Sequence, residues 1–190
     1  MSRLFNRFLL VSALLMGALT NSIQATHIVG GDLTYDYLGS NRYRFNLYVY
    51  VDCFFGRAEA IAQDAFSQIG VFDSNGNLRQ SLSLTRQGPT RVEGKNYSCV
   101  VPPADQCVDL YIFTTETTLS DIAGGYDLMW QRCCRNHSIK NIDRPEDVGI
   151  TFRTHIPQRS VIAANSSPKF KGVPPNFLCT NEPLKYDHSA

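Results

Sequence analysis

The sequence lacks an excess of either charge. It holds 18 Lys and Arg against 17 Asp and Glu over 190 residues. Proteins that bind nucleic acid or acidic membranes by electrostatic attraction carry a basic surface, so this balance predicts neither partner. Helix-forming stretches are scarce as well. Only residues 58–66 (AEAIAQDAF) have a helix-favouring composition, and that stretch is too short for more than a turn within a loop.

Motifs of the common hydrolases are also missing. Residues 28–31 read IVGG, which is how a mature trypsin-like protease begins, but no Gly-Asp-Ser-Gly-Gly or Gly-x-Ser-x-Gly segment follows. The carboxylates are scattered, and so are the histidines: His27, His137, His155 and His188. We therefore expect no enzymatic activity and no cofactor. His27 is interpreted as a polar residue at a strand start, and Gly30-Gly31 as a bulge or a close backbone approach.

Only one long apolar run is present, at residues 8–19 (FLLVSALLMGAL). Its length suits the roughly 7–15 residues of a signal-peptide core and falls short of the roughly 20 that span a bilayer. We predict an export signal over residues 1–25, cleaved after Ala25, with Thr26 as the mature N-terminus; an uncut anchor is the alternative. Removing Arg3 and Arg7 lowers the 18 basic residues to 16, against 17 acidic ones. No further membrane span is expected.

Six cysteines follow this segment: Cys53, Cys99, Cys107, Cys133, Cys134 and Cys179. An even number in an exported chain predicts three disulfides. Zinc ligands or a Cys/His nucleophile could be imagined at Cys133-Cys134 with His137, but no second ligand pair occurs at zinc spacing. Matching of strand faces favours three pairs among many possible ones: Cys53 with Cys134, Cys99 with Cys107, and Cys133 with Cys179.

Period-two alternation dominates the rest of the chain. Residues 42–53 (RYRFNLYVYVDC) place six residues on one face: Tyr43, Phe45, Leu47, Val49, Val51 and Cys53. Residues 28–38 precede this strand across a turn at Gly39-Ser40-Asn41, which predicts a hairpin. Further strands are expected at residues 68–72, 78–84, 108–118, 126–134 and 149–156, with turns such as Gly88-Pro89 between them.

Many short strands separated by turns predict an all-β fold, namely an antiparallel, immunoglobulin-like β-sandwich that disulfides stabilise. Leu128 and Trp130 are expected to face its core, with Cys134 on the same face and Cys133 pointing outward. The domain is expected over residues 26–180, and residues 181–190 as the start of a linker or of a following domain.

One segment resembles the opening of a calcium-binding loop, with oxygen ligands at Asp73, Asn75 and Asn77. Its glycine comes too early, and Leu84 stands where a bidentate Glu is needed. A hairpin turn through Asn75-Gly76 explains the same residues without a metal, so we expect the turn. Glycan acceptor sequences occur at Asn96, Asn136 and Asn165 and would be used only in a eukaryotic secretory pathway.

The ordered blocks THIVGGDLTYDYLGSNRYRFNLYVYVDC, IGVFDSNGNL, GGYDLMWQRCCRNHSIKNI and NSSPKFKGVPPNFLCTNEPLKYDHSA span essentially the whole mature chain. This set resembles the N-terminal region of large secreted surface proteins of gliding-type Gram-negative bacteria that use type IX secretion. The resemblance implies a location outside the outer membrane and further domains of the PKD or immunoglobulin-like type. Those proteins end in a gliding-motility-associated or sorting domain, and this chain is expected to be the head of such a longer protein.

Two functions follow as expectations. The first is a non-catalytic extracellular module of an adhesin-like surface protein that binds an extracellular glycan or protein, with Tyr48 and Tyr50 as an aromatic strand face. The second is an accessory domain of a secreted hydrolase whose catalytic part lies elsewhere.

Overall fold

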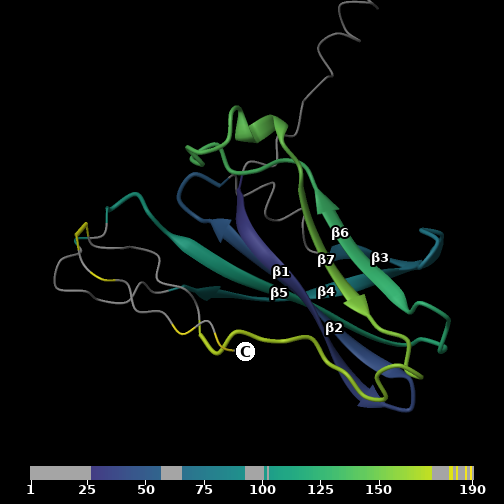
Figure 1. Cartoon of the computed structure of the whole chain (residues 1–190). Coiled ribbons are helices and arrows are strands. Elements are labelled where there is room, and N and C mark those ends of the chain that lie inside the picture. Colours follow the sequence, from purple (N-terminus) through teal and green to yellow (C-terminus); the bar gives the residue numbers. More distant parts are fainter. Residues whose placement is uncertain are drawn as a thin grey trace, which may run out of the picture.

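The computed structural model describes residues 27–56, 66–92, 101, 103–172, 180, 181, 183, 187 and 189. The regular elements within these ranges are β1 (Ile28–Gly39), β2 (Arg42–Asp52), β3 (Phe66–Asp73), β4 (Leu78–Arg91), β5 (Val108–Thr118), β6 (Tyr126–Arg132), the short 3-10 helix η1 (Pro145–Asp147) and β7 (Ile150–Ile156) (Figure 1). No helix in these ranges has the length and apolar character needed to cross a membrane.

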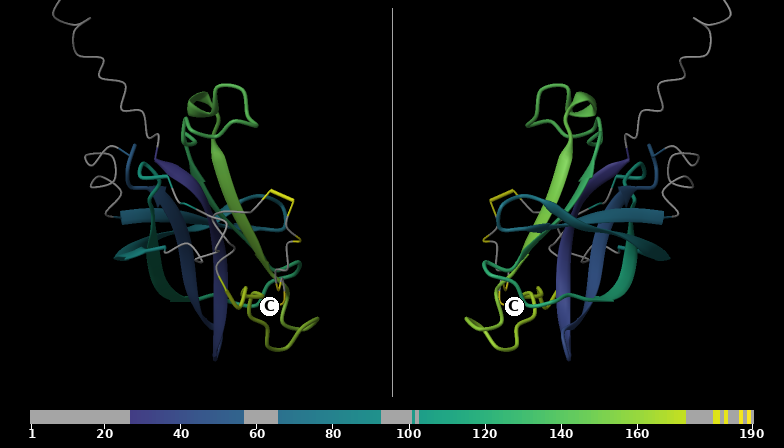
Figure 2. Two further views of the ribbon diagram at one scale, coloured as in Figure 1. Left: turned by 90° about the vertical axis from the view of Figure 1, so that its left-hand side faces the viewer. Right: turned by 90° about the vertical axis from the view of Figure 1, so that its right-hand side faces the viewer.

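All seven strands belong to one antiparallel sheet with the order β1-β2-β5-β4-β3-β6-β7. The prediction of an antiparallel all-β fold is confirmed. The sheet curls into a nearly closed barrel, in place of the two separate sheets expected of a sandwich. In Figure 2, β3 and β4 (blue to teal) cross the direction of β1 and β2 (purple to blue), which makes the curl visible.

Strand β4 is the reason for the single sheet. It pairs with β3 as far as Thr85 and with β5 from Thr85 onward, so one strand belongs to both halves. The sequence predicts that this strand ends at Leu84, because Gly88-Pro89 is typical of a turn. Instead, these two residues lie at a register shift between Gln87 and Thr90, with Gly88 at a φ of 96°. A bulge is where a strand tolerates proline, and it lets the strand bend around the barrel.

The two edge strands, β1 and β7, are joined at opposite ends of their seam. At the end near η1, the N–H of Asn136 donates to the carbonyl of Ile28 over 3.0 Å. At the other end, the chain after β7 returns to β1, and the N–H of Ser167 donates to the carbonyl of Tyr35 over 2.9 Å (Figure 1). The hydroxyl of Ser167 also lies 3.4 Å from that of Thr154 on β7. These contacts close the sheet, although β1 and β7 do not pair through a continuous ladder of backbone hydrogen bonds.

Between these ends, the ring of Phe152 lies directly over Gly31. A Cβ added at Gly31 would come within 2.4 Å of the ring and 2.3 Å of the carbonyl oxygen of Tyr48. The strand also shifts register between Ile28 and Gly30. The expected bulge and close approach at Gly30-Gly31 are therefore both present, and the close approach is made by the opposite edge of the sheet.

Side-chain oxygens cover the outer edge of β1. The N–H of Leu33 donates to Asp32 Oδ1 over 2.8 Å. The N–H groups of Tyr35 and Tyr37 donate to the hydroxyls of Ser167 and Ser166 over 2.9 and 3.0 Å. Uncovered edge strands invite pairing with other chains, and these contacts occupy the donors that would make such pairs.

The core follows the predicted alternation. The inward face of β2 is buried at Tyr43, Phe45, Leu47, Val49 and Val51. Leu128 and Trp130 face the same interior, as expected. The indole of Trp130 donates to the hydroxyl of Ser67 and stacks on Phe152, with ring centroids 5.2 Å apart. The Gly39-Ser40-Asn41 turn joins β1 and β2 as a hairpin, and all three residues have positive φ.

The predicted disulfide pairs are wrong. Cys53 bonds to Cys107, and Cys133 bonds to its neighbour Cys134. Face matching ignored strand order: Asp52 is paired with Val108, so Cys53 and Cys107 follow and precede adjacent strands. Cys134, just after the end of β6, bonds to the residue next to it and so is not available to Cys53. Cys133 is exposed as expected, while the predicted partners Cys99 and Cys179 lie outside the described residues.

Several other predictions fall outside the described residues and stay predictions. They are the export signal of residues 1–25, the mature start at Thr26, and the helical composition over residues 58–65, after which Phe66 begins β3.

Candidate binding cleft

The proposed calcium ligands form a hairpin turn. Asp73 Oδ1 accepts hydrogen bonds from the N–H groups of Asn75 and Asn77, both over 2.9 Å, and the amide of Asn77 reaches both carboxylate oxygens. The hydrogen bond from the N–H of Asn77, the largest of several such effects, lowers the pKa of Asp73 below its ordinary value. Both carboxylate oxygens therefore face N–H donors, which is the arrangement of a turn between β3 and β4. Among the residues that the structure describes, no three acids, histidines or cysteines gather as a metal site.

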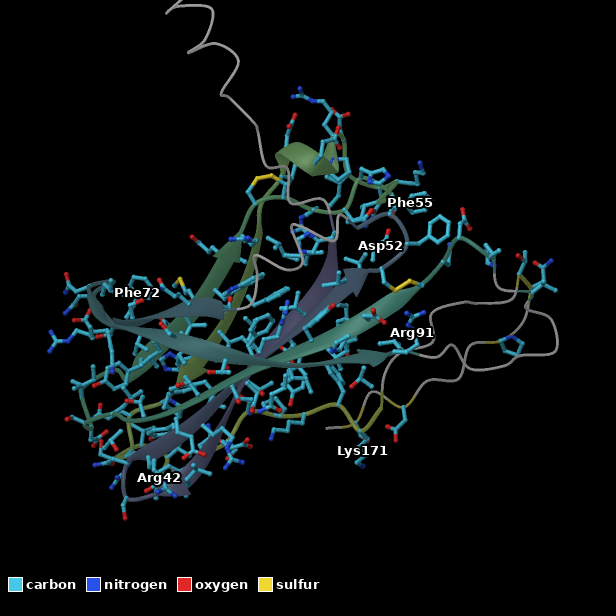
Figure 3. The ribbon with its side chains drawn as sticks, turned by 180° about the vertical axis from the view of Figure 1, so that it is seen from behind. Arg42, Asp52, Phe55, Phe72, Arg91 and Lys171 are labelled. Carbon is cyan, nitrogen blue, oxygen red and sulfur yellow. A yellow bond between two sulfur atoms is a disulfide. The ribbon has the colours of Figure 1, made fainter. Side chains whose placement is uncertain are left out.

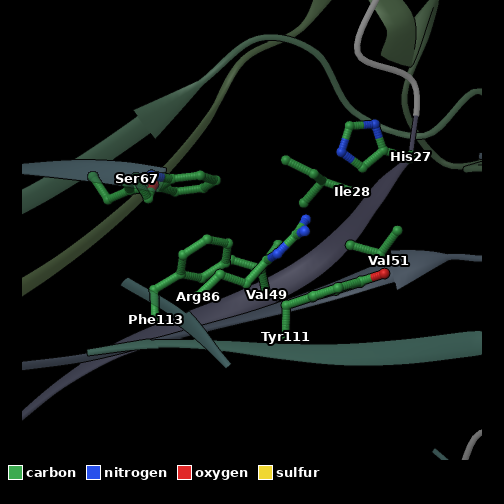
Figure 4. A pocket seen from close by; sticks show the side chains of 9 residues that line it. His27, Ile28, Val49, Val51, Ser67, Arg86, Tyr111 and Phe113 are labelled. Atoms are coloured by element: carbon green, nitrogen blue, oxygen red, sulfur yellow. Dashed lines mark hydrogen bonds between the residues drawn. The ribbon is translucent and has the colours of Figure 1, made fainter. Parts of the chain in front are cut away.

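The interior of the curled sheet holds a narrow cavity. Figure 4 shows side chains from β1, β2 and β5 converging around Arg86 of β4. The guanidinium of Arg86 lies 5.2 Å from the ring centroid of Tyr111, a distance at which a cation is attracted to an aromatic face. The cavity measures about 20 Å³. That volume suits a single water molecule, so the interior is a packed core and no organic ligand fits there.

A larger cleft lies at the end of the barrel near η1, with a volume of about 550 Å³. Pockets that bind small molecules measure roughly 300–1,000 Å³. Its walls come from the start of β1, the end of β2, the segment before β5 and the loop after β6, and the lining residues are Val29, Asp52, Phe55, Asp105, Gln106, Cys107, Val108, His137, Ser138 and Lys140.

Asp52 anchors the floor of this cleft. Its side chain is buried, and Oδ1 accepts hydrogen bonds from the N–H groups of Phe54 and Phe55, both over 2.9 Å. Oδ2 accepts a hydrogen bond from the side-chain amide of Asn136 over 2.8 Å. Strand alternation had placed Asp52 on the outer face of β2, but the loop after β6 covers it. One carboxylate thus fixes the loops on two sides of the cleft.

Asn136 is fully buried and supports the second loop. Besides its bond to Asp52, its Oδ1 accepts a hydrogen bond from the N–H of Ser138 over 2.7 Å. The amide nitrogen that a glycan would use is therefore occupied within the fold. Of the other acceptor sequences, the Asn165 amide donates to the hydroxyl of Tyr35 over 2.7 Å, and Asn96 lies outside the described residues.

Two exposed aromatic rings lie next to each other beside the cleft, and Phe55 belongs to its lining. Phe54 and Phe55 are 54% and 44% exposed, and their centroids lie 4.8 Å apart at an angle of 73°. The ring of His137 meets Phe55 edge-on, 5.7 Å away. Figure 3 shows Phe55 at the edge of the molecule, with Asp52 just inside it. Large apolar side chains gathered at the surface are typical of binding sites.

Polar side chains form the rest of the rim. Asp105, Gln106, Ser138 and Lys140 are all exposed at the cleft. The Cys53–Cys107 disulfide fixes the wall beside them, since it ties the end of β2 to the segment before β5. The rim therefore offers one carboxylate, one ammonium group, one amide and one hydroxyl around the aromatic rings.

A histidine beside a carboxylate lies elsewhere, on the outer face of β6 and β7. His155 Nδ1 is 3.0 Å from Asp127 Oδ1, and Arg153 donates to both carboxylate oxygens. The hydrogen bonds from Arg153 and His155 lower the pKa of Asp127, against the effect of burial. Within the described ranges, His155 has no hydroxyl or thiol partner, so this cluster has the composition of a surface ion pair and lacks a nucleophile.

The sequence-predicted residues are only partly brought together here. His137, considered with Cys133 and Cys134 as a ligand set, lines the cleft, while the two cysteines bond to each other. Tyr48 and Tyr50 are half-buried on β2 and do not line the cleft. Sequence reasoning missed Phe54-Phe55, although two adjacent aromatic residues directly after a strand are a visible signal.

Comparison with known proteins gives no match to a family model, to a curated protein or to a solved structure. The geometry of the cleft and the chemistry of its residues therefore carry the functional conclusion.

Proposed function

We propose that this chain is a non-catalytic extracellular module of a bacterial cell-surface or secreted adhesin-like protein, and that it binds its ligand in the cleft around Phe55. The observation that carries the proposal is the exposed pair Phe54 and Phe55 beside a cleft of about 550 Å³. A folded domain that exposes such rings loses the free energy that burying them would provide, so their position favours a binding role.

The rigidity of the cleft supports this role. The Asp52 and Asn136 hydrogen bond and the Cys53–Cys107 disulfide hold its walls before any ligand arrives. Walls fixed in advance reduce the ordering entropy lost on binding. The loops meet at one end of the sheet, which is also how immunoglobulin-like sandwiches present their binding loops.

Cysteine use and the sequence resemblance support a location outside the cell. Disulfides persist in oxidising compartments, and the predicted signal leads there. The resemblance to the N-terminal region of type IX-secreted surface proteins suggests that more domains of the same polypeptide follow.

The test compares binding with turnover. The oxidised chain would be applied to immobilised polysaccharide and protein fractions of a Gram-negative envelope, and biolayer interferometry would measure binding by the wild type, Phe55→Ala and Leu78→Ala. Leu78 is a matched control because it is 58% exposed and belongs to the β3–β4 hairpin. That hairpin lies across the molecule from Phe55, where Figure 3 labels Phe72.

We expect saturable binding to one fraction that Phe55→Ala weakens at least about tenfold and Leu78→Ala leaves unchanged. Equal binding by all three proteins would refute the cleft as the site. Hydrolysis of peptide or glycoside substrates that survives repeated purification would refute the non-catalytic role.

A further inference from the structure

We propose that the ligand of the cleft is a neutral carbohydrate, with one sugar ring lying against the ring of Phe55 and its hydroxyls bonded to the polar rim. This inference rests on the proposed binding function and adds the chemical class of the ligand.

The aromatic rings supply a surface for the apolar face of a sugar. Phe54 and Phe55 meet at 73° and stay 54% and 44% exposed, so the pair leaves ring surface available to a ligand. His137 packs edge-on to Phe55 at 84° and holds the Phe55 ring from the side of the second loop. A pyranose carries C–H groups on its ring faces and hydroxyls around its rim, so it matches an aromatic ring that polar groups surround.

The polar rim matches hydroxyl groups better than it matches a charged or purely apolar ligand. Asp105 accepts hydrogen bonds, Lys140 donates them, and Gln106 and Ser138 do both. A sugar hydroxyl is both donor and acceptor and can bond to each of these four side chains. Two carboxylates line the cleft, at Asp52 and Asp105, against the one ammonium group of Lys140, so an anionic polymer gains no net attraction there. An alkyl chain would leave the polar groups without partners.

The position of the cleft argues against an extended peptide. Peptides that bind by strand addition need an open sheet edge. This cleft is lined by strand ends and connecting segments, and the donors of β1 at Leu33, Tyr35 and Tyr37 are occupied by side-chain oxygens. A compact ring ligand needs no such edge.

The experiment uses an array of defined oligosaccharides, both neutral and anionic, followed by calorimetric titration of the strongest neutral sugar. The proteins are the wild type, Phe55→Ala, Phe55→Trp, Lys140→Ala and the control Leu78→Ala, each with its fold checked by circular dichroism. We expect neutral sugars to bind in preference to anionic ones. Phe55→Ala should weaken binding at least about tenfold, Phe55→Trp should retain it, Lys140→Ala should weaken it by a smaller factor, and Leu78→Ala should not change it.

Three outcomes would overturn the inference: no neutral sugar binds, anionic sugars bind more strongly than neutral ones, or Phe55→Ala binds as strongly as the wild type. The two proposals fail separately. If the envelope protein fraction binds in a Phe55-dependent way while no sugar does, the carbohydrate assignment is wrong and the binding function stands. If nothing binds in a Phe55-dependent way, both are wrong.

Discussion

The side-chain amide of Asn136 donates a 2.8 Å hydrogen bond to the buried carboxylate of Asp52, 84 positions earlier in the chain. This bond joins the loop after β6 to the end of β2, two segments whose strands are not neighbours in the sheet. It connects stability and binding, because the same carboxylate fixes the backbone of Phe54 and Phe55.

Asn136→Ala leaves one oxygen of a buried carboxylate without its donor. We expect the free energy of unfolding to fall by about 1–3 kcal/mol, as measured by urea titration. Asn75→Ala is the control: Asn75 is exposed, its backbone N–H forms the turn, and the change should stay within about 0.5 kcal/mol. Equal stability of the two variants would show that the Asp52 contact contributes nothing.

Gly31→Ala should destabilise the fold by about 1–3 kcal/mol, because the new methyl group meets the Phe152 ring and the Tyr48 carbonyl oxygen. Gly30→Ala is a matched neighbour, since nothing lies within 4 Å of a Cβ there. Thermal melts of both variants measure the difference. A Gly31→Ala protein that melts with the wild type would mean that β1 and β7 do not approach so closely in solution.

Replacing Cys53 and Cys107 together by alanine should lower stability by about 2–4 kcal/mol, since this disulfide links positions 54 residues apart and restricts the unfolded chain. The double replacement of Cys133 and Cys134 is the comparison. That bond joins adjacent residues and closes no long loop, so its loss should matter much less. Unfolding monitored by Trp130 fluorescence measures the stability of both double variants. A larger loss for the Cys133 and Cys134 variant would contradict the assigned pairs.

Acid should destabilise the protein through its paired carboxylates. Hydrogen bonds from Arg153, opposed by burial, hold the pKa of Asp127 below its ordinary value. At Asp36, burial raises the pKa, but hydrogen bonds from Lys169 and Asn46 outweigh it and the pKa is lowered. A lowered folded-state pKa gives stability that is complete above the unfolded-state value and is lost as the pH falls through the folded-state value.

Urea midpoints measured from pH 6 down to pH 2 should therefore decline below about pH 4. Asp127→Asn should flatten part of that decline, and Asp143→Asn, at an exposed site, should leave the profile as it is. A profile that Asp127→Asn does not alter would show that the Arg153 pair is broken in solution.

Local alternation was enough to place most strands. The predicted strand over residues 108–118 coincides with β5, because the segment is rich in β-branched and aromatic residues and its buried side chains, Tyr111 and Phe113, stand two positions apart. Alternation failed at Asp52, since its burial depends on Asn136 from a distant loop. It also failed at Gly88-Pro89, where a turn signal serves a bulge within β4.

Features that depend on strand order could not be predicted from the sequence. Cys53 meets Cys107 because β2 and β5 are neighbours, and no local pattern encodes that neighbourhood. The cleft has the same origin, since Phe55, Asp105 and His137 come from three separate segments. Each of them looks like an ordinary loop residue until the sheet is assembled.

The seam between β1 and β7 also sets an order of events for the newly made chain. Backbone contacts that close it join Ile28 to Asn136 and Tyr35 to Ser167, so the first strand waits for residues that are synthesised more than a hundred positions later. Contacts of such long sequence separation form slowly. Until Ser166 and Ser167 arrive, the N–H groups of Tyr35 and Tyr37 lack their side-chain acceptors, and β1 is open to pairing with another copy of the chain. The interval in which the new chain is most prone to aggregate therefore falls before the segment after β7 has joined the fold, and a chaperone that shields β1 would act then.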